Sequence, residues 1–305
     1  MTPEGPAASP GRAGFVAVVG RPNVGKSTLV NRLVGQKVSI VSDKPQTTRN
    51  RILAVVNRPG GQIVLFDTPG IHKPAHRMNE RMVEAALRSL AQVDVALWLV
   101  DVTEAYGPGE RYVRDVLKRC GKPVVLGINK IDLVAKLKIL PAIETYRHFM
   151  DFAEVIPLSA LGGENAELLA ERLLALLPDG PPLYPDDFLT DQPERFFVAE
   201  MVRERILHHT REEIPYSTAV VIDSFQEGQE LVRIEASILV ERQSQKGILI
   251  GRAGSMLKTI GTEARRSIEA FLGAKVFLGL FVKVREGWRE DDRALQEMGL
   301  GKKGD

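Results

Sequence analysis

The segment GRPNVGKS at 20–27 fits the pattern G-x-x-x-x-G-K-[ST], which is typical of loops that bind nucleotide phosphates. It lies between FVAVVG, an apolar run of strand length, and LVNRLVG, whose apolar residues have helical spacing. Gly20 and Gly25 let successive backbone N–H groups turn toward phosphate oxygens, and the start of the helix adds partial positive charge. Lys26 supplies a point charge for the outer phosphates, and Ser27 supplies a hydroxyl for Mg²⁺. The alternative is an ordinary glycine-containing turn between a strand and a helix. The predicted nucleotide-binding residues of this loop are Gly20, Arg21, Pro22, Asn23, Val24, Gly25, Lys26, Ser27 and Thr28.

Two motifs downstream of this loop indicate a metal ion and a switch. DTPG at 67–70 follows the apolar run GQIVLF, so its aspartate could hold Mg²⁺ through water and its glycine N–H could meet the γ-phosphate. In KPQTTRNR at 44–51, a threonine hydroxyl could reach Mg²⁺ only while the γ-phosphate is present, and we favour Thr48 over Thr47. The alternative for this stretch is a polar surface loop. The predicted metal ligands are Ser27, Thr48 and Asp67, and the predicted nucleotide contacts here are Asp67, Thr68, Pro69 and Gly70.

The choice of base is predicted by two later segments. VVLGINKID at 124–132 is a strand-like run that ends in polar residues. The Asp132 carboxylate can accept two N–H bonds from the edge of guanine, whereas adenine would leave it unpaired. Lys130 can lay its aliphatic stem over the base. VIPLSALGG at 155–163 brings a backbone N–H to the guanine O6 position. The residues predicted to contact the base are Asn129, Lys130, Asp132, Ser159, Ala160 and Leu161.

The tetrapeptide GRAG occurs at 11–14 and again at 251–254, and its surroundings decide what each copy does. The first copy lies in a Pro- and Ala-rich start and is interpreted as a flexible spacer. The second lies between two apolar-faced helical stretches, a hairpin typical of KH modules that clamp single-stranded RNA. Residues 242–285 carry nine basic and two acidic side chains, as a basic face requires. The alternative is a solvated helical hairpin with a glycine turn. The predicted RNA-binding residues are Lys246, Ile250, Gly251, Arg252, Ala253, Gly254, Lys258 and Arg265.

Length and composition set the remaining bounds. The chain has 305 residues, of which 44% are hydrophobic and 26% charged, so we expect a globular protein of about two domains. Its net charge of +2 does not by itself point to nucleic acid. The single cysteine, Cys120, cannot form an internal disulfide, which fits a reducing cytoplasm. No apolar run approaches the roughly 20 residues of a membrane span, and the N-terminus lacks the apolar core of a signal peptide.

The pattern of elements predicts an α/β fold in two parts. Each N-terminal motif follows an apolar strand-like run, and helical stretches intervene, so we expect a P-loop domain with a mostly parallel sheet. Five prolines within 178–193 indicate a linker or stiff connector. Beyond it, helical and alternating stretches predict a smaller α+β domain of the type II KH arrangement. The predicted boundaries are a disordered tail at 1–13, a G domain at 14–180, a linker at 181–192 and a KH domain at 193–305.

The ordered set GRPNVGKS, QTTR, DTPG, NKID and SAL resembles the nucleotide-binding motifs of translation-factor-class GTPases. Together with VERQSQKGILIGRAG and VKVREGW, it resembles the Era family, in which a G domain is joined to a type II KH domain. The resemblance implies a GTPase that binds the single-stranded 3′ end of small-subunit (16S) rRNA and has a role in 30S assembly. We expect GTP and GDP as ligands and a monomer in the cytoplasm, with peripheral contact at the inner membrane left open.

One departure concerns the attacking water. In the Ras-like pattern a Gln after D-x-x-G orients this water, but here the residue is Ile71, which cannot hydrogen-bond it. We therefore assign no catalytic side chain and expect slow intrinsic hydrolysis. In related GTPases an Asn at the position of Asn23 ligates K⁺ beside the phosphates, and the alternative is that Asn23 only shapes the loop. Two functions follow: a GTPase switch that acts on rRNA, or an RNA checkpoint or tether in which hydrolysis is incidental.

Overall fold

The computed structural model describes residues 11–74 and 76–300, which form two compact units. Of the described residues, the first unit comprises 11–38, 51–73 and 85–191. The second unit comprises 39–50, 74, 76–84 and 192–300. Two short segments from the N-terminal half of the sequence therefore belong to the second unit, which the predicted boundaries did not include.

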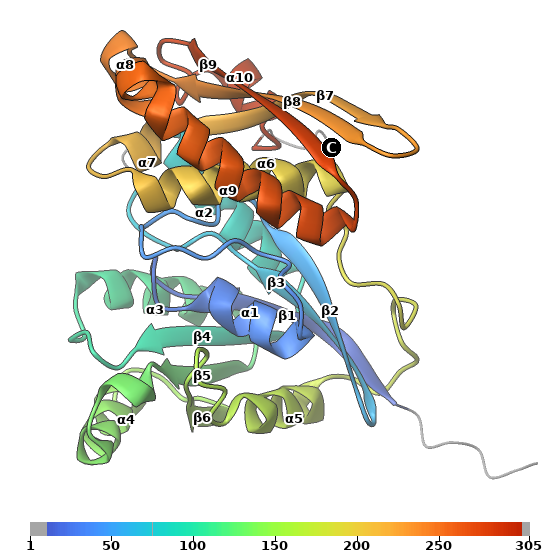
Figure 1. Ribbon diagram of the computed structural model, residues 1–305. Coiled ribbons are helices and arrows are strands. Elements are labelled where there is room, and N and C mark those ends of the chain that lie inside the picture. Colours follow the sequence, from blue (N-terminus) through green and yellow to red (C-terminus); the bar gives the residue numbers. More distant parts are fainter. Residues whose placement is uncertain (1–10, 75, 301–305) are drawn as a thin grey trace, which may run out of the picture. The chain divides into compact units, whose positions relative to one another are not determined.

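The first unit is an α/β fold around one sheet, as Figure 1 shows. The order β2-β3-β1-β4-β5-β6 has six strands, all parallel to their neighbours except β2, which is antiparallel to β3. This confirms the predicted α/β class with a mostly parallel sheet. Its elements are β1 (Arg12–Val19), α1 (Lys26–Val34), β2 (Ile52–Arg58), β3 (Gly61–Asp67), β4 (Val95–Asp101), α3 (Pro108–Cys120), β5 (Val124–Asn129), η1 (Ile131–Leu133), η2 (Lys136–Lys138), α4 (Ile139–Arg147), β6 (Glu154–Pro157) and α5 (Ala166–Leu176).

The central strands form because their side chains are apolar on both faces. Every residue of β4, from Val95 to Asp101, is buried, as a strand covered by helices on both sides requires. Alternate residues such as Val19, Trp98 and Ile128 share one core cluster with side chains of α3 and α4. On the opposite face, α1 and α5 contact each other and the strands. Because parallel strands end at one edge of the sheet, the loops that follow β1, β3, β4 and β5 gather there.

Three residues of the first GRAG, 12–14, belong to strand β1, so its interpretation as a flexible spacer is wrong. Arg12 begins β1 and pairs with Gly61 of β3, and the Arg12 N–H donates to Gly60 O at 2.9 Å. Ala13 is buried and donates its N–H to Pro178 O at 3.1 Å. The small side chains let the strand continue between its neighbours. Residues 1–10 of the predicted tail lie outside the described residues.

The proline-rich segment predicted as a linker packs on the first unit up to residue 191. The buried Gln62 side chain of β3 accepts hydrogen bonds from the N–H groups of Leu183 and Tyr184, at 2.8 and 2.9 Å. The Tyr184 ring stacks on Phe188 at 4.7 Å between centroids, and both pack against the core cluster. These contacts order the segment, since its backbone and its rings both have partners in the sheet.

The second unit has the α+β architecture that the sequence predicts for its C-terminal half. Its sheet has the order β7-β8-β9, with β7 antiparallel and β9 parallel to β8. Helices α6 and α9 contact each other and cover one face of this sheet (Figure 1). Its elements are α6 (Glu194–His209), α7 (Ile214–Ser217), β7 (Ala219–Glu227), β8 (Val232–Val240), α8 (Gln243–Ile250), η3 (Arg252–Gly254), α9 (Ser255–Leu272), β9 (Val276–Val284) and α10 (Asp292–Glu297).

Helix α2 (Arg77–Ala91) contributes side chains to both cores. Met78 and Met82 belong to a buried cluster of the second unit that is centred on Trp288. Ala86 and Leu90, one and two turns later, belong to the core cluster of the first unit. The helix that follows the DTPG motif is thus a continuous covalent link between the two cores.

Candidate functional site

The phosphate-binding loop connects β1 to α1 and has the backbone that the motif predicts. Gly25 has φ 97°, a left-handed conformation, and a Cβ at this position would collide with the amide of Asn129. Asn23 has φ 65°, a conformation that Asn adopts more readily than most residues, so it shapes the loop. The Lys26 side chain is buried at 6% exposure where α1 begins.

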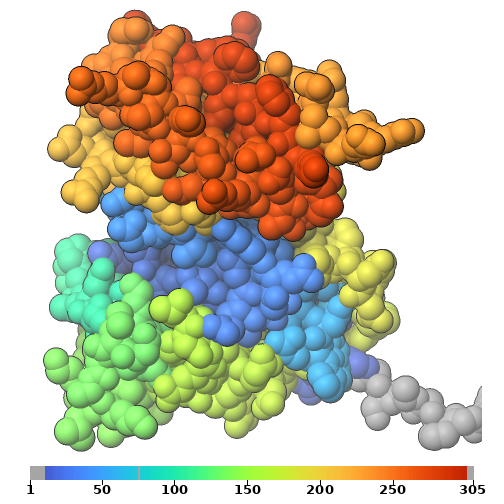
Figure 2. Space-filling view, viewed as in Figure 1, coloured from blue at the N-terminus to red at the C-terminus, as the bar shows by residue number. Residues whose placement is uncertain are grey.

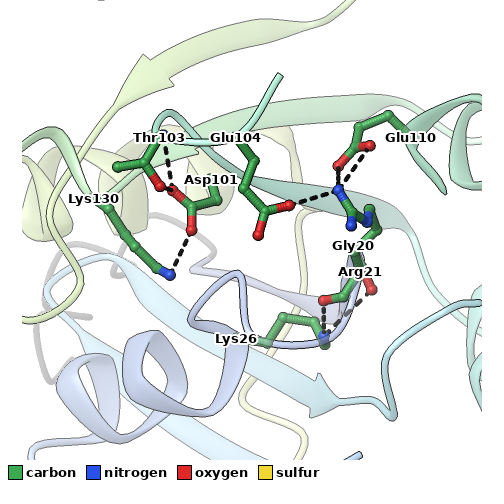
Figure 3. A network of polar contacts seen from close by, with 8 residues as sticks. All are labelled: Gly20, Arg21, Lys26, Asp101, Thr103, Glu104, Glu110 and Lys130. Carbon is green, nitrogen blue, oxygen red and sulfur yellow. Dashed lines mark hydrogen bonds and ion pairs between the residues drawn. The ribbon is translucent and has the colours of Figure 1, made fainter. Parts of the chain in front are cut away.

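Lys26 lies within the loop that precedes it. Its Nζ donates to Arg21 O at 2.8 Å and to Gly20 O at 3.3 Å (Figure 3). Burial lowers the pKa of Lys26 to about 8, against the opposing influence of the Asp67 carboxylate, which raises it. A buried ammonium with carbonyl partners gains most from a bound polyanion, so the site is electrostatically prepared for phosphate.

Arg21 ties the phosphate-binding loop to the segment after β4. Its Nη1 contacts the Glu104 carboxylate at 2.6 Å and the buried Glu110 carboxylate of α3 at 3.0 Å (Figure 3). A Cβ on Gly109 would lie 2.6 Å from Arg21 Nε, so the glycine makes room for the guanidinium. These two acidic partners were missed from the sequence, because they are more than eighty residues away.

The DTPG motif meets the phosphate-binding loop directly. Ile71 donates its N–H to Gly20 O at 3.0 Å, and a Cβ on Gly70 would lie 2.6 Å from Pro22 N. Thr68 Oγ1 donates to Val18 O at 2.7 Å, which joins the motif to β1. The Ile71 side chain is fully buried in the core of the first unit. Packing therefore explains the aliphatic residue at this position, which orients no water.

Asn129 connects the phosphate-binding loop to the segments predicted to contact the base. Its Nδ2 donates to Val24 O at 2.8 Å, and its Oδ1 accepts the Ala160 N–H at 2.8 Å. The amide thus holds together the phosphate-binding loop, the end of β5 and the loop after β6. Asp132 is exposed in η1, where its carboxylate is available to a ligand.

The loop at 159–161 is held in place by hydrogen bonds to other residues of the first unit. The Ser159 N–H donates to Glu164 O at 3.0 Å, so this N–H and that of Ala160 already have partners. Arg32 of α1 donates to the carbonyl oxygens of Ala160 and Leu161. The Leu161 side chain is 73% exposed beside these anchored residues.

An acidic side chain that sequence reasoning missed holds Lys130. Asp101, at the end of β4, contacts Lys130 Nζ at 2.5 Å and is 4% exposed (Figure 3). Its Oδ1 accepts from Thr103 N and Oγ1, at 2.9 and 2.6 Å. Burial would raise the pKa of Asp101, but the hydrogen bonds from Lys130 and Thr103 outweigh it and the pKa is lowered. A signal existed in the sequence, since Asp101 ends a strand parallel to β5 and the two strand ends must be neighbours.

The three predicted metal ligands fall in different units. Ser27 and the buried Asp67 belong to the first unit, whereas Thr48 lies in segment 39–50 of the second. Their hydroxyl and carboxylate oxygens are the donors that Mg²⁺ prefers. Among residues 11–74 and 76–300, no three His, Cys, Asp or Glu side chains gather in a way that could hold a metal ion.

Segment 39–50 is anchored inside the second unit by buried arginines. Arg49, 5% exposed, donates to the carbonyl oxygens of Thr218 at 2.8 Å and Pro215 at 3.1 Å. Its guanidinium lies 5.9 Å from the centroid of the Trp288 ring. Arg203 of α6, also buried, donates to Thr47 O. The loop that carries Thr48 thus has a defined place on α6 and α7.

The predicted RNA-binding hairpin has the form that the sequence indicates. Helices α8 and α9 flank the loop at 251–254, and α9 runs across the face of the second unit that Figure 2 shows in orange-red. Gly251 has φ 73°, and a Cβ there would lie 2.8 Å from Met256 N. Arg252 and Ala253 are exposed at the tip, and Ala253 has φ 51°.

A hollow of about 400 Å³ lies between α9 and β9, next to this loop. Of the predicted RNA-binding residues, Gly254, Lys258 and Arg265 line it, whereas Lys246 and Ile250 lie on α8 and do not. Its apolar side chains were missed, because β9 follows the hairpin by sequence but returns beside α9 only in the fold. The full lining is Gly254, Leu257, Lys258, Gly261, Thr262, Arg265, Leu278 and Leu280.

Comparison with known proteins agrees with this geometry. A family model described as a 50S ribosome-binding GTPase matches residues 15–130, and a KH domain model matches residues 213–289. The chain is 52% identical over 293 residues to GTPase Era of Geobacter metallireducens, covering 95% of this chain and 98% of the relative. It is 53% identical over 289 residues to GTPase Era of Geotalea uraniireducens, covering 94% and 97%.

Two solved structures are similar over nearly the whole chain. One is Era in complex with MgGDPNP and nucleotides 1506–1542 of 16S ribosomal RNA, with a TM-score of 0.92 and 42% identity. The other is a variant of Aquifex aeolicus Era bound to GDP and AlF4⁻, with a TM-score of 0.91 and 42% identity. Each comparison covers 95% of this chain and 99% of the other. No helix in the described part of the chain is long and apolar enough to cross a membrane.

Proposed function

This chain belongs to the Era family of GTPases, and we propose that it couples GTP hydrolysis to binding of the single-stranded 3′ end of 16S rRNA during 30S assembly. The observation that carries this proposal is the presence in one chain of a guanine-type P-loop site and a GxxG hairpin beside a leucine-lined hollow. A relative that is 42% identical has been solved with MgGDPNP and 16S rRNA nucleotides, which supports both ligands.

In the proposed nucleotide site, each motif has one task. The N–H groups of the loop at 20–28 bind the phosphates, and Lys26 neutralises their charge. Asp132 accepts the guanine N–H groups, and Lys130, held by Asp101, lays its stem along the base. When bound, Mg²⁺ neutralises charge on the outer phosphates, and Ser27, Asp67 and Thr48 would hold it.

The attacking water has no side chain to orient it at Ile71, which is buried in the core. We propose that K⁺ bound at Asn23 supplies positive charge beside the phosphates, where an arginine finger acts in other GTPases. The test is turnover in potassium and in sodium at equal ionic strength, for the native chain and for Asn23→Ala. Faster turnover in potassium that is lost in the variant supports this assignment, and equal rates in both salts contradict it.

In the proposed RNA site, the loop at 251–254 approaches the sugar–phosphate backbone closely, because its glycines present no side chain. Arg252, at the exposed tip, contacts a phosphate, and Lys258 and Arg265 lie along the hollow. Leu257, Leu278 and Leu280 form the apolar surface on which bases are buried. The site thus combines ionic contacts that position the strand with a pocket that takes its bases.

A pair of matched variants tests this assignment. Ala253 is exposed and has φ 51°, a region in which Asp and Asn are enriched, so both residues fit there without rebuilding the loop. Ala253→Asp places a carboxylate next to the RNA phosphates, and Ala253→Asn has nearly the same shape without charge. We expect the Asp variant to lose at least tenfold in affinity for a 3′-end oligonucleotide and the Asn variant to bind like the native chain. Equal affinities would contradict the proposal.

Burial of Ile71 favours a second candidate function, a GTP-gated tether on RNA in which hydrolysis is incidental. Single-turnover hydrolysis with and without the RNA oligonucleotide separates the two. Stimulation by RNA supports the switch, and an unchanged slow rate supports the tether.

A further inference from the structure

Two phenylalanines of β9 are exposed on the face of the sheet that points away from α9. Along this strand, Leu278 and Leu280 line the hollow beside α9, and Leu280 packs close to Gly261 of that helix. Because successive side chains of a strand alternate between faces, Phe277 and Phe281 point to the opposite side. Their exposures are 49% and 51%, although full burial of an aromatic ring would be favourable.

The two rings are arranged as separate flat platforms. They lie four residues apart on one face, about 13 Å along the strand, with Gly279 between them. A Cβ on this glycine would lie 3.6 Å from Glu235 Cγ and 3.7 Å from Phe281 Cε2, so the Phe281 ring leans toward Gly279. From β8, the Arg233 guanidinium lies 5.6 Å from the centroid of the Phe277 ring. Beside these neighbours, Phe277 and Phe281 each keep about half of their surface exposed.

One end of this sheet face is covered in the second unit, whereas Arg233 and Glu235, beside the phenylalanines, are exposed. At its far end, Ala219 of β7 and Leu239 of β8 are buried against the cluster of Met78, Met82 and Trp288. In the part of the chain that the structure describes, this cluster does not include Phe277 or Phe281. The exposed pair therefore lies apart from this cluster on β9, which is an edge strand of the sheet (Figure 1).

The chemistry of the patch favours nucleic-acid bases over another protein or a lipid surface. Two isolated rings with a cation over one of them resemble a stacking platform more than a continuous apolar surface. Glu235 lies across from Gly279, and Lys283 contacts Asp223 at 3.5 Å, so the neighbouring charge is mixed. A membrane surface would need a larger apolar area and a net positive rim.

Position supplies the second argument, because β9 borders the proposed RNA site with its other face. A strand of RNA that leaves the hollow at Leu278 and Leu280 has only to pass the edge of β9 to meet the rings. We propose that Phe277 and Phe281 each stack on a base of single-stranded RNA that continues beyond the hollow, and so extend the RNA footprint around β9. This inference rests on the proposed RNA-binding function.

The test compares a short and a long RNA from the same 3′-end sequence, of six and twelve nucleotides, bound to the full chain. The variant Phe277→Ala/Phe281→Ala should bind the long RNA about tenfold or more weakly, because base stacking on an aromatic ring contributes strongly to affinity. It should bind the short RNA within twofold of the native chain. Because the lost contacts are not ionic, the salt dependence of long-RNA binding should be unchanged.

The variant Phe277→Leu/Phe281→Leu is the matched control, since leucine keeps the apolar surface but has no flat ring. We expect it to lose affinity for the long RNA almost as the alanine pair does, whereas Phe281→Trp should retain it. Leucine variants that bind like the native chain, or equal losses for short and long RNA, would overturn the proposal. So would a change in sedimentation or vesicle pelleting with unchanged RNA affinity, which would assign the patch to a second copy or a lipid surface.

Ala253→Asp separates this inference from the function on which it rests. It should weaken the binding of both the short and the long RNA, because both enter the hollow. If it weakens neither, the RNA-binding site itself is wrongly placed, whatever the phenylalanine variants do. Circular dichroism checks that each variant folds. The affinity for GDP, which depends on residues of the nucleotide site, is a second check.

Discussion

Replacing Asp101 by asparagine should weaken nucleotide binding through Lys130. The carboxylate is 4% exposed and its partner Lys130 is 31% exposed, so the degree of burial of this ion pair is intermediate between that of a buried pair and that of a surface pair. Breaking a buried pair costs about 3–5 kcal/mol, whereas surface pairs contribute about 0–1 kcal/mol. We expect an intermediate loss in binding, about 1.4 kcal/mol, or roughly a tenfold rise in the Kd for GDP.

The assay is equilibrium titration with a fluorescent GDP analogue in a double-mutant cycle. Asp101→Asn, Lys130→Ala and the double variant are measured together, and the double variant should be no weaker than Lys130→Ala alone. Preference for GTP over ATP should persist, because Asp132 is untouched. Asp115→Asn is the control, since Asp115 is exposed on α3, outside the nucleotide motifs, and pairs with Arg114 at 2.6 Å. Additive effects of the two single changes, or native affinity for Asp101→Asn, would refute the reasoning.

Three further predictions concern Lys26, Arg49 and the glycines of the hairpin. The pKa of Lys26 is about 8 in the folded chain, below its ordinary value of 10.5. Between pH 8 and pH 10.5 the chain therefore takes up a proton when it unfolds. Across this pH range the free energy of unfolding should rise with pH for the native chain relative to Lys26→Met. Bound phosphate favours the ammonium, so GDP affinity should fall above about pH 8, and calorimetry at pH 8.5 in two buffers should detect proton uptake. Arg49→Met removes donors to buried carbonyl groups and should lower the free energy of unfolding by about 2–4 kcal/mol. Backbone hydrogen exchange in residues 39–50 should become faster. An exchange rate equal to that of the native chain would contradict the anchoring of this segment by Arg49. Gly251→Ala should disturb the hairpin more than Gly254→Ala in a thermal melt, because only the first places a Cβ against Met256, and equal losses would count against this.

The α/β class and the nucleotide motifs could be predicted because their determinants are local. An apolar run followed by a polar motif recurs at β1, β3 and β5, and parallel strands bring such ends to one edge. The hairpin around Gly251 was predictable for the same reason, since helix, loop and helix are contiguous.

Contacts between distant segments could not be predicted. Nothing near Arg49 in the sequence indicates that its guanidinium is buried against carbonyl groups of α7, more than 160 residues away. The first GRAG has the composition of a spacer, yet strand pairing with β3 orders it. The acidic partners of Arg21 come from the turn after β4 and from α3, more than eighty residues away in the sequence.

The central claim is that one chain joins a GTPase site to an RNA clamp and that the clamp acts on the site. It is tested most directly by single-turnover GTP hydrolysis with and without the 3′-end oligonucleotide, in Ala253→Asp and Ala253→Asn. We predict that RNA accelerates hydrolysis in the native chain and in the Asn variant, and that the Asp variant keeps only the basal rate. RNA stimulation of equal size in all three, or in none of them, would contradict the account.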